Sequence, residues 1–431
     1  MGDKLIRVAV GLSGGVDSSL SAAMLVEEGY EVTGVFLECW REPGCRAEED
    51  RKDALAVALK LKIPFVVLDF RKEYKERVVE YFYREYEAGR TPNPDTMCNR
   101  EIKFGMFYEW AMDNDFDYVA TGHYARVQRI QLDSPSHKAS EEQGNLAREE
   151  YGLVRGKDVG KDQSYFLYQI RPEQLAHILF PVGGMLKSQV REEAKKRGLA
   201  TASKPDSQGI CFIGEVDVRK LLRERIKERR GEIVFGMKNF KHQASSSKQY
   251  QNTKNQNSKL FDDRNLVLGT YDNYEVVGVH EGVAFYTVGQ RVGKGLDKKR
   301  LKELNELGKF PYDPAEMPVL YVVGKDVVNN RLVVGFEEDT YKSQFVVREI
   351  KWLVSRERFE NLARARGIWV RIRNLGELVE ARVQLESSAR EERLTATLSR
   401  PVRGVAEGQA CVLYSDSSVD AVVLGGGVIN C

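Results

Sequence analysis

Long apolar runs are missing from this chain of 431 residues. No stretch approaches the roughly 20 apolar residues of a membrane-spanning helix, and residues 1–4 carry no signal-peptide pattern. These absences predict a cytoplasmic protein with no membrane partner. The chain also has no large excess of charge of one sign, since it contains 66 basic and 64 acidic residues. A nucleic-acid partner would therefore have to be met by a local basic face.

Cysteine is scarce, and the few cysteines lie far apart in the sequence. Scattered cysteines in a chain of this size exclude a disulfide scaffold. No CxxC pair is present, although the cysteines are numerous enough for an iron–sulfur cluster. No residue is assigned as a metal ligand from spacing alone. The six cysteines are Cys39, Cys45, Cys98, Cys211, Cys411 and Cys431.

The stretch SGGVDS at residues 13–18 is the most informative part of the chain. It stands between an apolar run at residues 6–10 and an amphipathic pattern at residues 18–28, which predicts a buried strand, a tight turn and a helix. Such a turn directs backbone N–H groups and a helix dipole at one point, where phosphate is favoured. The stretch lacks the lysine of the Walker loop and the glycine spacing of the dinucleotide fingerprint. It therefore predicts a phosphate site of another kind.

Strand and helix patterns alternate after this turn, which predicts a doubly wound parallel sheet. Ligands of such sheets lie beyond the C-terminal ends of the strands, so Leu37, Gly122 and His123 are expected near the nucleotide. His123 either meets substrate or binds a backbone carbonyl. The predicted strands cover residues 31–37, 65–69 and 118–121, and the predicted helices cover residues 48–61 and 72–87.

A proline-rich loop at residues 91–95 precedes a helical pattern that continues to residue 112. Asp95 is well suited to cap this helix, which would make Cys98 its third residue. A thiol in a first helical turn is biased toward thiolate, although a charged Asp95 opposes this bias. An ordinary cap beside a semi-buried cysteine is an equally good reading of these residues. Cys211, taken alone, has the surroundings of a buried structural cysteine.

The second half of the chain has an all-β pattern. Short β-branched runs separated by glycine and asparagine turns begin at residue 266 and predict a small central unit and a terminal barrel. Residues 131–150 and 237–264 are polar and lack periodicity, so we expect disordered insertions there. A basic stripe at residues 216–228 fits either tRNA phosphates or a solvated helix face. The predicted domains are residues 1–215, 216–316 and 317–431.

Seven motifs in order identify a family resemblance. SGGVDS resembles the PP-loop of ATP pyrophosphatases, and the whole set resembles the tRNA-specific 2-thiouridylase family over nearly the full chain. The resemblance implies a PP-loop α/β domain, a central β-rich domain that contacts tRNA, and a C-terminal β-barrel. It implies adenylation of the C2 oxygen of the wobble uridine and its replacement by persulfide sulfur, giving 2-thiouridine, AMP and pyrophosphate. The motifs after SGGVDS are NPDxxCNxxIKF, ATGHYAR, KDQSYFL, SQGICFIG, YTVGQR and EGQACVLY.

The resemblance also implies roles for individual residues. Cys211 matches the persulfide carrier, Cys98 its nucleophilic or resolving partner, and Asp95 a general acid or base beside the target base. Asp17 is implied to help hold Mg²⁺. ATP binding is implied for Gly11, Leu12, Ser13, Gly14, Gly15, Val16, Asp17, Ser18, Leu37 and Gly122. Contact with tRNA is implied for Asn93, Pro94, Asp95, His123, Lys161, Asp162, Gln163, Arg373, Asn374 and Gln409.

The implied cofactors are ATP and Mg²⁺, and the implied partners are the anticodon loop of tRNA and a protein persulfide donor such as a cysteine desulfurase. The chain is expected to act as a monomer. A disulfide between Cys98 and Cys211 is expected after turnover, and we expect the Cys211 loop to move until the Cα atoms lie within about 7 Å. Arg373 and Asn374 depart from the family, which often has an aromatic residue after the arginine.

Three other functions remain open on the sequence alone. A PP-loop enzyme that adenylates a small molecule would need neither Cys98 nor Cys211. An iron–sulfur tRNA thiolase usually shows CxxC spacing, which is absent here. A non-catalytic RNA-binding module would leave the intact SGGVDS stretch without a role. Serine at both cysteines would separate the first alternative from 2-thiolation.

Overall fold

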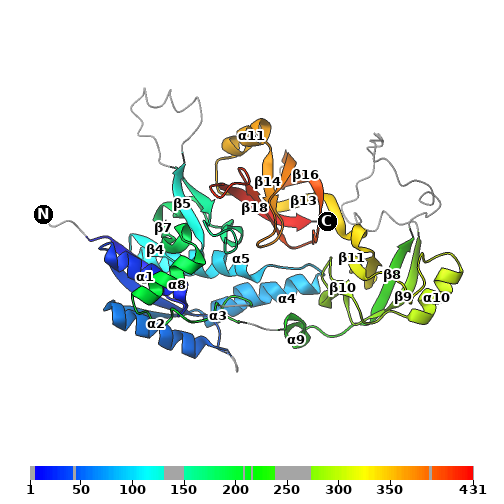
Figure 1. Cartoon of the computed structure of the whole chain (residues 1–431), viewed down its shortest axis with the longest axis horizontal. Coiled ribbons are helices and arrows are strands. Elements are labelled where there is room, and N and C mark those ends of the chain that lie inside the picture. The colour runs from blue at the N-terminus through cyan, green and yellow to red at the C-terminus, as the bar shows by residue number, and fades with distance from the viewer. Residues whose placement is uncertain are drawn as a thin grey trace.

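The computed structural model describes residues 5–41, 45–130, 150–206, 209–214, 217–237, 273–387 and 391–430. These residues form a parallel α/β sheet, a smaller central sheet and a closed barrel. In Figure 1 the barrel lies between the other two parts, and α4 (Glu80–Glu87) runs from the first part toward the central sheet. The predicted fold class is confirmed.

The N-terminal sheet has five parallel strands in the order β3-β2-β1-β4-β7. β1 pairs with both β2 and β4, and its residues Val8, Ala9 and Val10 are fully buried, as expected of a central strand covered on both faces. α1 packs against α2 and α8. The strands are β1 Arg7–Gly11, β2 Glu31–Glu38, β3 Phe65–Asp69, β4 Tyr118–Ala120 and β7 Ile178–Leu179, and the helices are α1 Val16–Glu27, α2 Ala47–Leu61 and α8 Lys187–Lys196.

Two long helical stretches complete this part, and each contains a π-helical segment. Such segments have a wider turn than an α-helix and are frequent at functional sites. The first stretch is α3 Arg71–Tyr74, η1 Lys75–Val79 and α4 Glu80–Glu87, and the second is α5 Pro94–Cys98, η2 Asn99–Met106 and α6 Phe107–Asp113. The remaining elements are β5 Ala125–Ile130, β6 Glu150–Arg155, the 3₁₀ turns η3 Ser164–Leu167, η4 Pro172–His177 and η5 Pro181–Gly184, and α9 Val218–Arg223.

The central sheet has the order β10-β11-β12-β8-β9, with β12 and β8 parallel. Phe235 lies 5.0 Å from Phe310 and 5.5 Å from Phe336 between ring centroids, and these rings form its core. The elements are β8 Gly231–Met237, β9 Asn273–His280, η8 Val283–Phe285, β10 Arg291–Val292, α10 Lys298–Glu306, β11 Leu320–Asp326 and β12 Arg331–Gly335.

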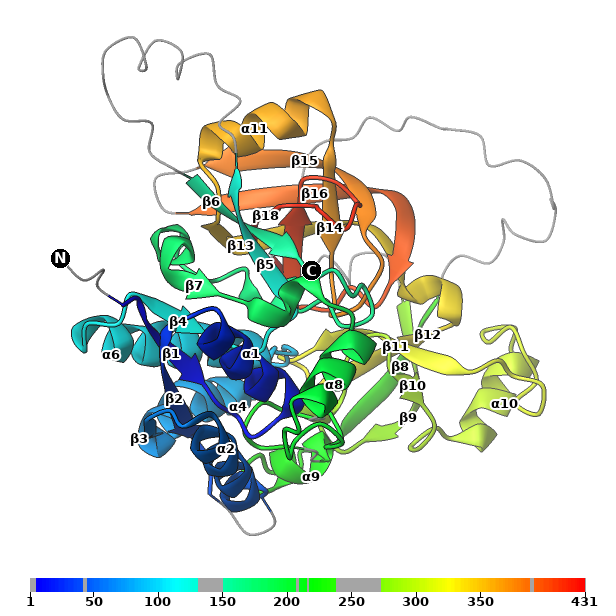
Figure 2. The same cartoon turned by 60° about the vertical axis from the view of Figure 1, so that its left-hand side comes forward.

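The C-terminal part is a closed six-stranded barrel of antiparallel neighbours, which leaves no free sheet edge. Figure 2 shows it above the N-terminal and central sheets. Its core includes Val347, Ile368, Leu394 and Leu413, all fully buried. The elements are η9 Glu337–Thr340, β13 Tyr341–Trp352, α11 Arg356–Ala365, β14 Ile368–Arg371, β15 Val379–Ser387, β16 Glu392–Arg403, β17 Ala410–Tyr414 and β18 Val423–Asn430.

The structure corrects the predicted boundary after residue 316. β11 and β12 belong to the central sheet, because β12 pairs with β8 from about a hundred residues earlier, and the barrel strands begin at Tyr341. The basic helix expected at residues 216–228 is shorter, since Asp217 caps α9 and the helix ends at Arg223. Residues 131–149 and 238–264 of the two expected insertions lie outside the described residues.

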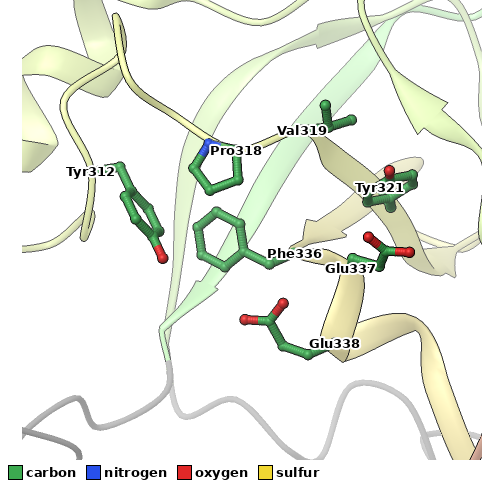
Figure 3. Close-up of a pocket in the computed structure, with 7 residues that line it drawn as sticks. All are labelled: Tyr312, Pro318, Val319, Tyr321, Phe336, Glu337 and Glu338. Carbon is green, nitrogen blue, oxygen red and sulfur yellow. The ribbon is translucent and has the colours of Figure 1, made fainter.

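No helix in the described part of the chain is long and apolar enough to cross a bilayer. A cavity of about 260 Å³ opens on the central part, and Figure 3 shows its lining around the Phe336 ring. None of its lining residues is among those predicted for a site. They are Tyr312, Pro318, Val319, Tyr321, Phe336, Glu337 and Glu338.

A buried ion-pair cluster joins the barrel to the first part. The fully buried Asp162 carboxylate lies 3.0 Å from Arg155 Nε and 2.8 Å from Arg371 Nη1 of β14, and it accepts from the N–H groups of Gly156 and Ser164. Burial raises the pKa of Asp162, but Arg371 and the backbone donors outweigh burial and hold it below its usual value. This carboxylate is enclosed by protein partners, and the tRNA contact predicted for Asp162 stays a prediction.

We expect Asp162→Ala to lower the free energy of unfolding by about 3–5 kcal/mol, because two buried guanidinium groups lose their counter-charge. Urea denaturation followed by fluorescence measures the change. Asp420→Ala is the matched control, since Asp420 also pairs with an arginine, Arg126 at 2.8 Å, but is 69% exposed. That variant should lose no more than about 1 kcal/mol. Equal losses in the two variants would contradict a structural role for the cluster.

Candidate functional site

The turn between β1 and α1 is held by its own hydroxyl groups. Ser18 Oγ accepts from Ser13 N–H at 3.2 Å and donates to the Gly15 carbonyl at 3.2 Å. Gly14 has a φ of +74°, and a Cβ there would lie 2.2 Å from the Asp50 carbonyl oxygen, so glycine is required. The turn opens a helix of 12 residues. This geometry suits a phosphate group.

The carboxylate of Asp17 faces a lysine and a tyrosine. Lys187 Nζ lies 2.8 Å from both carboxylate oxygens, and the Tyr124 hydroxyl donates to one of them at 2.7 Å. Lys187 also lies 2.9 Å from Asp206. Neither Lys187 nor Tyr124 is among the residues predicted from the sequence, although Tyr124 stands inside the ATGHYAR motif.

Three further cations lie close to this turn. Lys161 and Arg191 bind Asp206 at 2.7 and 2.5 Å, and Lys204 donates to the Gly14 carbonyl at 2.9 Å. Ammonium and guanidinium groups are the usual side-chain partners of phosphate oxygens. Lys161, predicted as a tRNA contact, therefore lies within the cationic surroundings of the turn.

The other residues predicted to bind ATP line or support the same turn. The Leu12 N–H donates to the Val35 carbonyl at 2.8 Å, and Leu37 is buried near the end of β2. Gly122 follows β4, and a Cβ there would lie 2.6 Å from the Ser18 nitrogen. Gly122 thus packs directly on the first turn of α1. Gly11 ends β1 and Val16 begins α1.

Asp17 also bears on magnesium binding. Mg²⁺ usually takes one or two protein carboxylates together with phosphate oxygens and water. Asp17 supplies such a carboxylate next to the turn, so its chemistry fits, provided that Lys187 moves away from the oxygens it now holds. Among the described residues no group of three or more His, Cys, Asp or Glu side chains is arranged to hold a metal ion.

A pair of cysteines forms a second centre. Cys98 ends α5, and its Sγ lies 3.5 Å from Sγ of Cys211 on the loop before α9. The two thiols are therefore already in contact, and the movement expected of the Cys211 loop on disulfide formation stays a prediction. Cys39, which follows β2, is buried in the same cluster of side chains. No cysteine in the described part of the chain is disulfide-bonded.

The residues before Cys98 hold the Cys211 loop. Asn93, not Asp95, caps α5, because its side chain accepts from the Asp95 and Thr96 N–H groups at 3.1 and 3.3 Å. The capping expectation for Asp95 is corrected, and Cys98 becomes the fifth helical residue. Asp95 Oδ1 instead accepts from the Cys211 N–H at 2.9 Å. Asp95 thus lies beside the thiol pair, and its role as a general acid or base beside the target base stays a prediction.

Tyr74 fixes the other side of the Cys211 loop. Its side chain is fully buried, and its hydroxyl donates to the Cys211 carbonyl at 2.6 Å. The ring meets Phe212 edge to face at 5.8 Å between centroids. Phe212 has a φ of +65°, an unfavourable value for a bulky residue, so this loop is strained at the position next to Cys211.

The two thiols differ in acidity. The hydrogen bond from Cys98 lowers the pKa of Cys211 to about 7, against the effect of burial and with help from Lys103. Burial raises the pKa of Cys98 well above that of a free thiol, and Cys211 raises it further. Burial also raises the pKa of Asp95. Cys211 is therefore the more acidic thiol of the pair.

His123 does not face solvent. It is buried between Phe104 and Phe180, its Nδ1 lies 2.7 Å from Thr121 Oγ1, and its Nε2 lies 3.4 Å from Lys103 Nζ. Burial and then Lys103 lower the pKa of His123 well below its usual value. The imidazole is thus neutral and bonded within the protein, and the tRNA contact predicted for His123 would need these neighbours to move.

The other predicted tRNA contacts lie in two places. Gln163 accepts from the Tyr124 N–H at 3.0 Å, and Gln409 donates to the Thr91 carbonyl at 2.8 Å, so both amides hold loops of the first part. Arg373 and Asn374 are exposed at the turn that follows β14 of the barrel. Pro94 opens α5 beside Asn93.

Three basic residues in α9 and just after it are paired within the protein. Arg223 binds Glu281 at 2.5 Å, Arg225 binds Glu80 at 2.6 Å, and Arg219 stacks over Tyr286 at 5.2 Å from its centroid. These contacts hold α9 to its neighbours. The stripe therefore offers less free positive charge to RNA than the sequence alone indicates.

Three family models cover most of the chain. The model described as "tRNA methyl transferase HUP domain" matches residues 6–215. Those described as "tRNA methyl transferase PRC-barrel domain" and "Aminomethyltransferase beta-barrel domain" match residues 263–336 and 342–429. The first match contains both the phosphate-type turn and the thiol pair.

Curated relatives align along nearly the full length. The tRNA-specific 2-thiouridylase MnmA of Akkermansia muciniphila is 37% identical, covering 98% of each chain. The proteins of the same name from Listeria monocytogenes and Streptococcus pyogenes are 36% and 38% identical, each covering 99% of this chain and 95% of the relative. The chain belongs to the tRNA-specific 2-thiouridylase family. The family membership predicted from the motifs is thereby confirmed.

In this member of the 2-thiouridylase family, sequence reasoning missed Lys103, Tyr74 and Lys187. Lys103 lies inside NPDxxCNxxIKF but five positions after Cys98, a spacing that points away from it on a regular α-helix. The π-helical segment η2 widens the turn and returns Lys103 to the thiol side. Tyr74 and Lys187 carry no local signal, since their partners lie 137 and 170 residues away.

Proposed function

We propose that this chain is an ATP-dependent tRNA sulfurtransferase that converts the wobble uridine of tRNA to 2-thiouridine. The observation that carries the proposal is the 3.5 Å contact between the thiols of Cys98 and Cys211, with Asp95 bonded to the same loop. Full-length relatives named tRNA-specific 2-thiouridylase support the substrate. An enzyme that only adenylates a small molecule has no use for such a pair.

The chemistry requires two activations. The C2 carbonyl of uracil is a poor electrophile, so its oxygen must first become a leaving group, and transfer of adenylate from ATP makes it one. The turn at residues 13–18 holds the pyrophosphate that leaves, and the nearby Lys187 and Lys204 balance its charge. A Mg²⁺ ion held through Asp17 would supply further positive charge to the phosphates.

Sulfur reaches the uridine through a cysteine persulfide. Cys211, the more acidic thiol, accepts sulfur from a protein persulfide donor, and Cys98 later accepts the bond to Cys211 when the sulfur leaves. Asp95, with its raised pKa, exchanges protons beside both thiols. The wobble base stacks in an anticodon loop and must turn outward to reach this pair, which single-stranded loops permit at modest cost.

The proposal extends to the partners and domains. The first part binds ATP and carries the thiols. The central sheet, whose last strand ends at Gly335, contacts tRNA. The barrel presents Arg373 and Asn374 to the tRNA. We further propose that the protein acts as a monomer in the cytoplasm. The test combines purified protein, ATP, unmodified tRNA and a persulfide donor, followed by mass analysis of wobble nucleosides. Absence of 2-thiouridine under conditions that yield AMP and pyrophosphate would refute the assignment.

We expect Asp17→Asn to reduce pyrophosphate release by about a hundredfold, equivalent to about 3 kcal/mol, because the variant loses the charge that would hold Mg²⁺. tRNA binding, measured by filter retention, should be unchanged, since Asp17 lies in the phosphate turn. Asp113→Asn, at an exposed position ending α6, is the control. ADP as the main nucleotide product in the wild type would contradict the PP-loop assignment.

A further inference from the structure

We propose that Lys103 is a catalytic residue of the sulfur-transfer step: its ammonium group holds the sulfur of Cys211 as an anion, and neutral His123 holds Lys103 in position. This inference rests on the proposed 2-thiolation. It adds to Cys98, Cys211 and Asp95 a cation that lies beside the reacting sulfur.

Lys103 is placed by the fold against the thiol pair. Its ammonium group lies beside the Cys211 loop, 5.8 Å from the centroid of the Phe212 ring and 3.4 Å from His123 Nε2. Burial lowers the pKa of Lys103, but Cys211, Cys98 and Asp95 outweigh burial and raise it, so the side chain stays charged. Lys103 is half-buried, and an ammonium group shielded from water is costly unless an anion faces it. The Cys211 thiolate and Asp95 are anions of that kind.

His123 explains how the ammonium group is held. Because a charged lysine can only donate, His123 Nε2 must accept from Lys103, and the ring proton then lies on Nδ1 and points to Thr121 Oγ1 at 2.7 Å. The chain Thr121, His123, Lys103, Cys211 runs from the end of β4 to the sulfur. Gly122, in the middle of this stretch, packs on the phosphate turn. The residues 121–123 therefore lie between the nucleotide turn and the thiol pair.

The ammonium group of Lys103 stabilises two anions in turn, first the Cys211 thiolate and then the Cys211 persulfide. The Cys211 thiolate attacks the outer sulfur of a donor persulfide, the donor S–S bond breaks, and the donor leaves as a thiol after taking a proton. The terminal sulfur on Cys211, deprotonated, then attacks C2 of the adenylated uridine. A C–S bond forms, the C2–O bond breaks, and AMP leaves with the electron pair. Lys103 stabilises the sulfur anion before each attack.

Cys98 completes the cycle. After losing its proton to Asp95, its sulfur attacks Sγ of Cys211, the S–S bond to the transferred sulfur breaks, and the electron pair stays on the sulfur at C2 to give 2-thiouridine. The protein is left with a Cys98–Cys211 disulfide. Two electrons and two protons from a thiol reductant restore the pair.

The test measures the acidity of Cys211 directly. Full-length wild type and variants are alkylated with iodoacetamide across a pH series, and the Cys211 peptide is quantified by mass spectrometry. Five groups face this sulfur or its loop, and all remain in the protein except the one replaced: Cys98, Lys103, Asp95, Cys39 and Tyr74. The wild-type rate should rise through a midpoint at about pH 7.

Lys103→Met should move that midpoint upward by about one pH unit or more and slow alkylation at neutral pH by about tenfold. Lys103→Arg, which keeps the charge, should stay near the wild type. His123→Leu should give a smaller upward shift, because it releases Lys103 without removing it. Lys52→Met is the matched control, since it removes one lysine from an exposed pair with Glu48 in the same part.

Two results would overturn the proposal. One is a wild-type Cys211 that titrates like an ordinary thiol near 9, a measurement that does not depend on any variant folding. The other is an unchanged midpoint in Lys103→Met. In the same samples, Lys103→Met should release pyrophosphate normally and form less than about 1% of the 2-thiouridine. Failure of wild type to form 2-thiouridine would refute the proposed function, while the titration would still decide how Lys103 acts on Cys211.

Discussion

Replacing Cys211 by serine is expected to abolish 2-thiouridine formation, with a loss of at least about a thousandfold, while release of AMP and pyrophosphate continues. Serine cannot carry a persulfide, whereas the phosphate turn is formed by other residues. Cys98→Ser should also stop turnover, but at a later stage. The Cys98→Ser variant should still accept sulfur on Cys211, because it lacks only the Cys98 thiol that later bonds to Cys211.

Two measurements separate these outcomes. Mass analysis of wobble nucleosides reports the product, and peptide mass maps taken after one turnover without reductant report a Cys98–Cys211 disulfide in the wild type only. Cys45→Ser is the control, because Cys45 is partly exposed and its thiol lies 4.0 Å from the Trp40 carbonyl oxygen, away from the Cys98–Cys211 pair. A Cys211→Ser enzyme that still thiolates tRNA from a protein persulfide would exclude the relay. Free hydrosulfide or an iron–sulfur cluster would then be the source.

Gly122→Ala is expected to weaken ATP binding by about 10- to 100-fold. Its Cβ would lie 2.6 Å from the Ser18 nitrogen and 2.7 Å from the Asp17 carbonyl carbon, both backbone atoms, so the first turn of α1 must shift. Overpacking of this kind costs about 1–3 kcal/mol, and the shift moves the amides that face the phosphates. Titration calorimetry with ATP measures the affinity.

Gly184→Ala provides the matched control for this change, since a Cβ at Gly184 meets nothing within 4 Å. That variant should bind ATP as the wild type does. Thermal unfolding of both variants separates a local shift from global loss of structure. Equal ATP affinity in Gly122→Ala and the wild type would show that the phosphates bind away from this turn.

The sequence could predict those parts of the site that depend on short, continuous motifs. SGGVDS encodes a turn by the conformations its glycines allow, and the motifs around Cys98 and Cys211 identify the family. Their positions relative to each other follow from the parallel sheet, which brings loops to one edge. The two sulfurs lie 3.5 Å apart, so the two loops meet in the structure.

The parts that the sequence could not predict depend on distant partners or on helix geometry. Asp162 reads as a charged residue in a loop, and only the fold brings Arg371 to it from 209 positions away. Lys103 comes five positions after Cys98, and only the wider turn of the π-helical segment brings it to the thiol side. Asp95 has a good capping side chain, but Asn93 takes that role because Asp95 is drawn to the Cys211 backbone.

The contact between Cys98 and Cys211 also sets the effective concentration of one thiol at the other. Groups held this close behave as if present at concentrations far above those of any free thiol in solution. A mixed disulfide between Cys211 and an outside thiol is therefore short-lived, because Cys98 displaces the bound thiol from Cys211 before another thiol from solution can react. The same proximity disfavours reduction of the Cys98–Cys211 disulfide by a reductant with a single thiol. A reductant that carries two thiols is therefore the natural source of electrons for the next cycle.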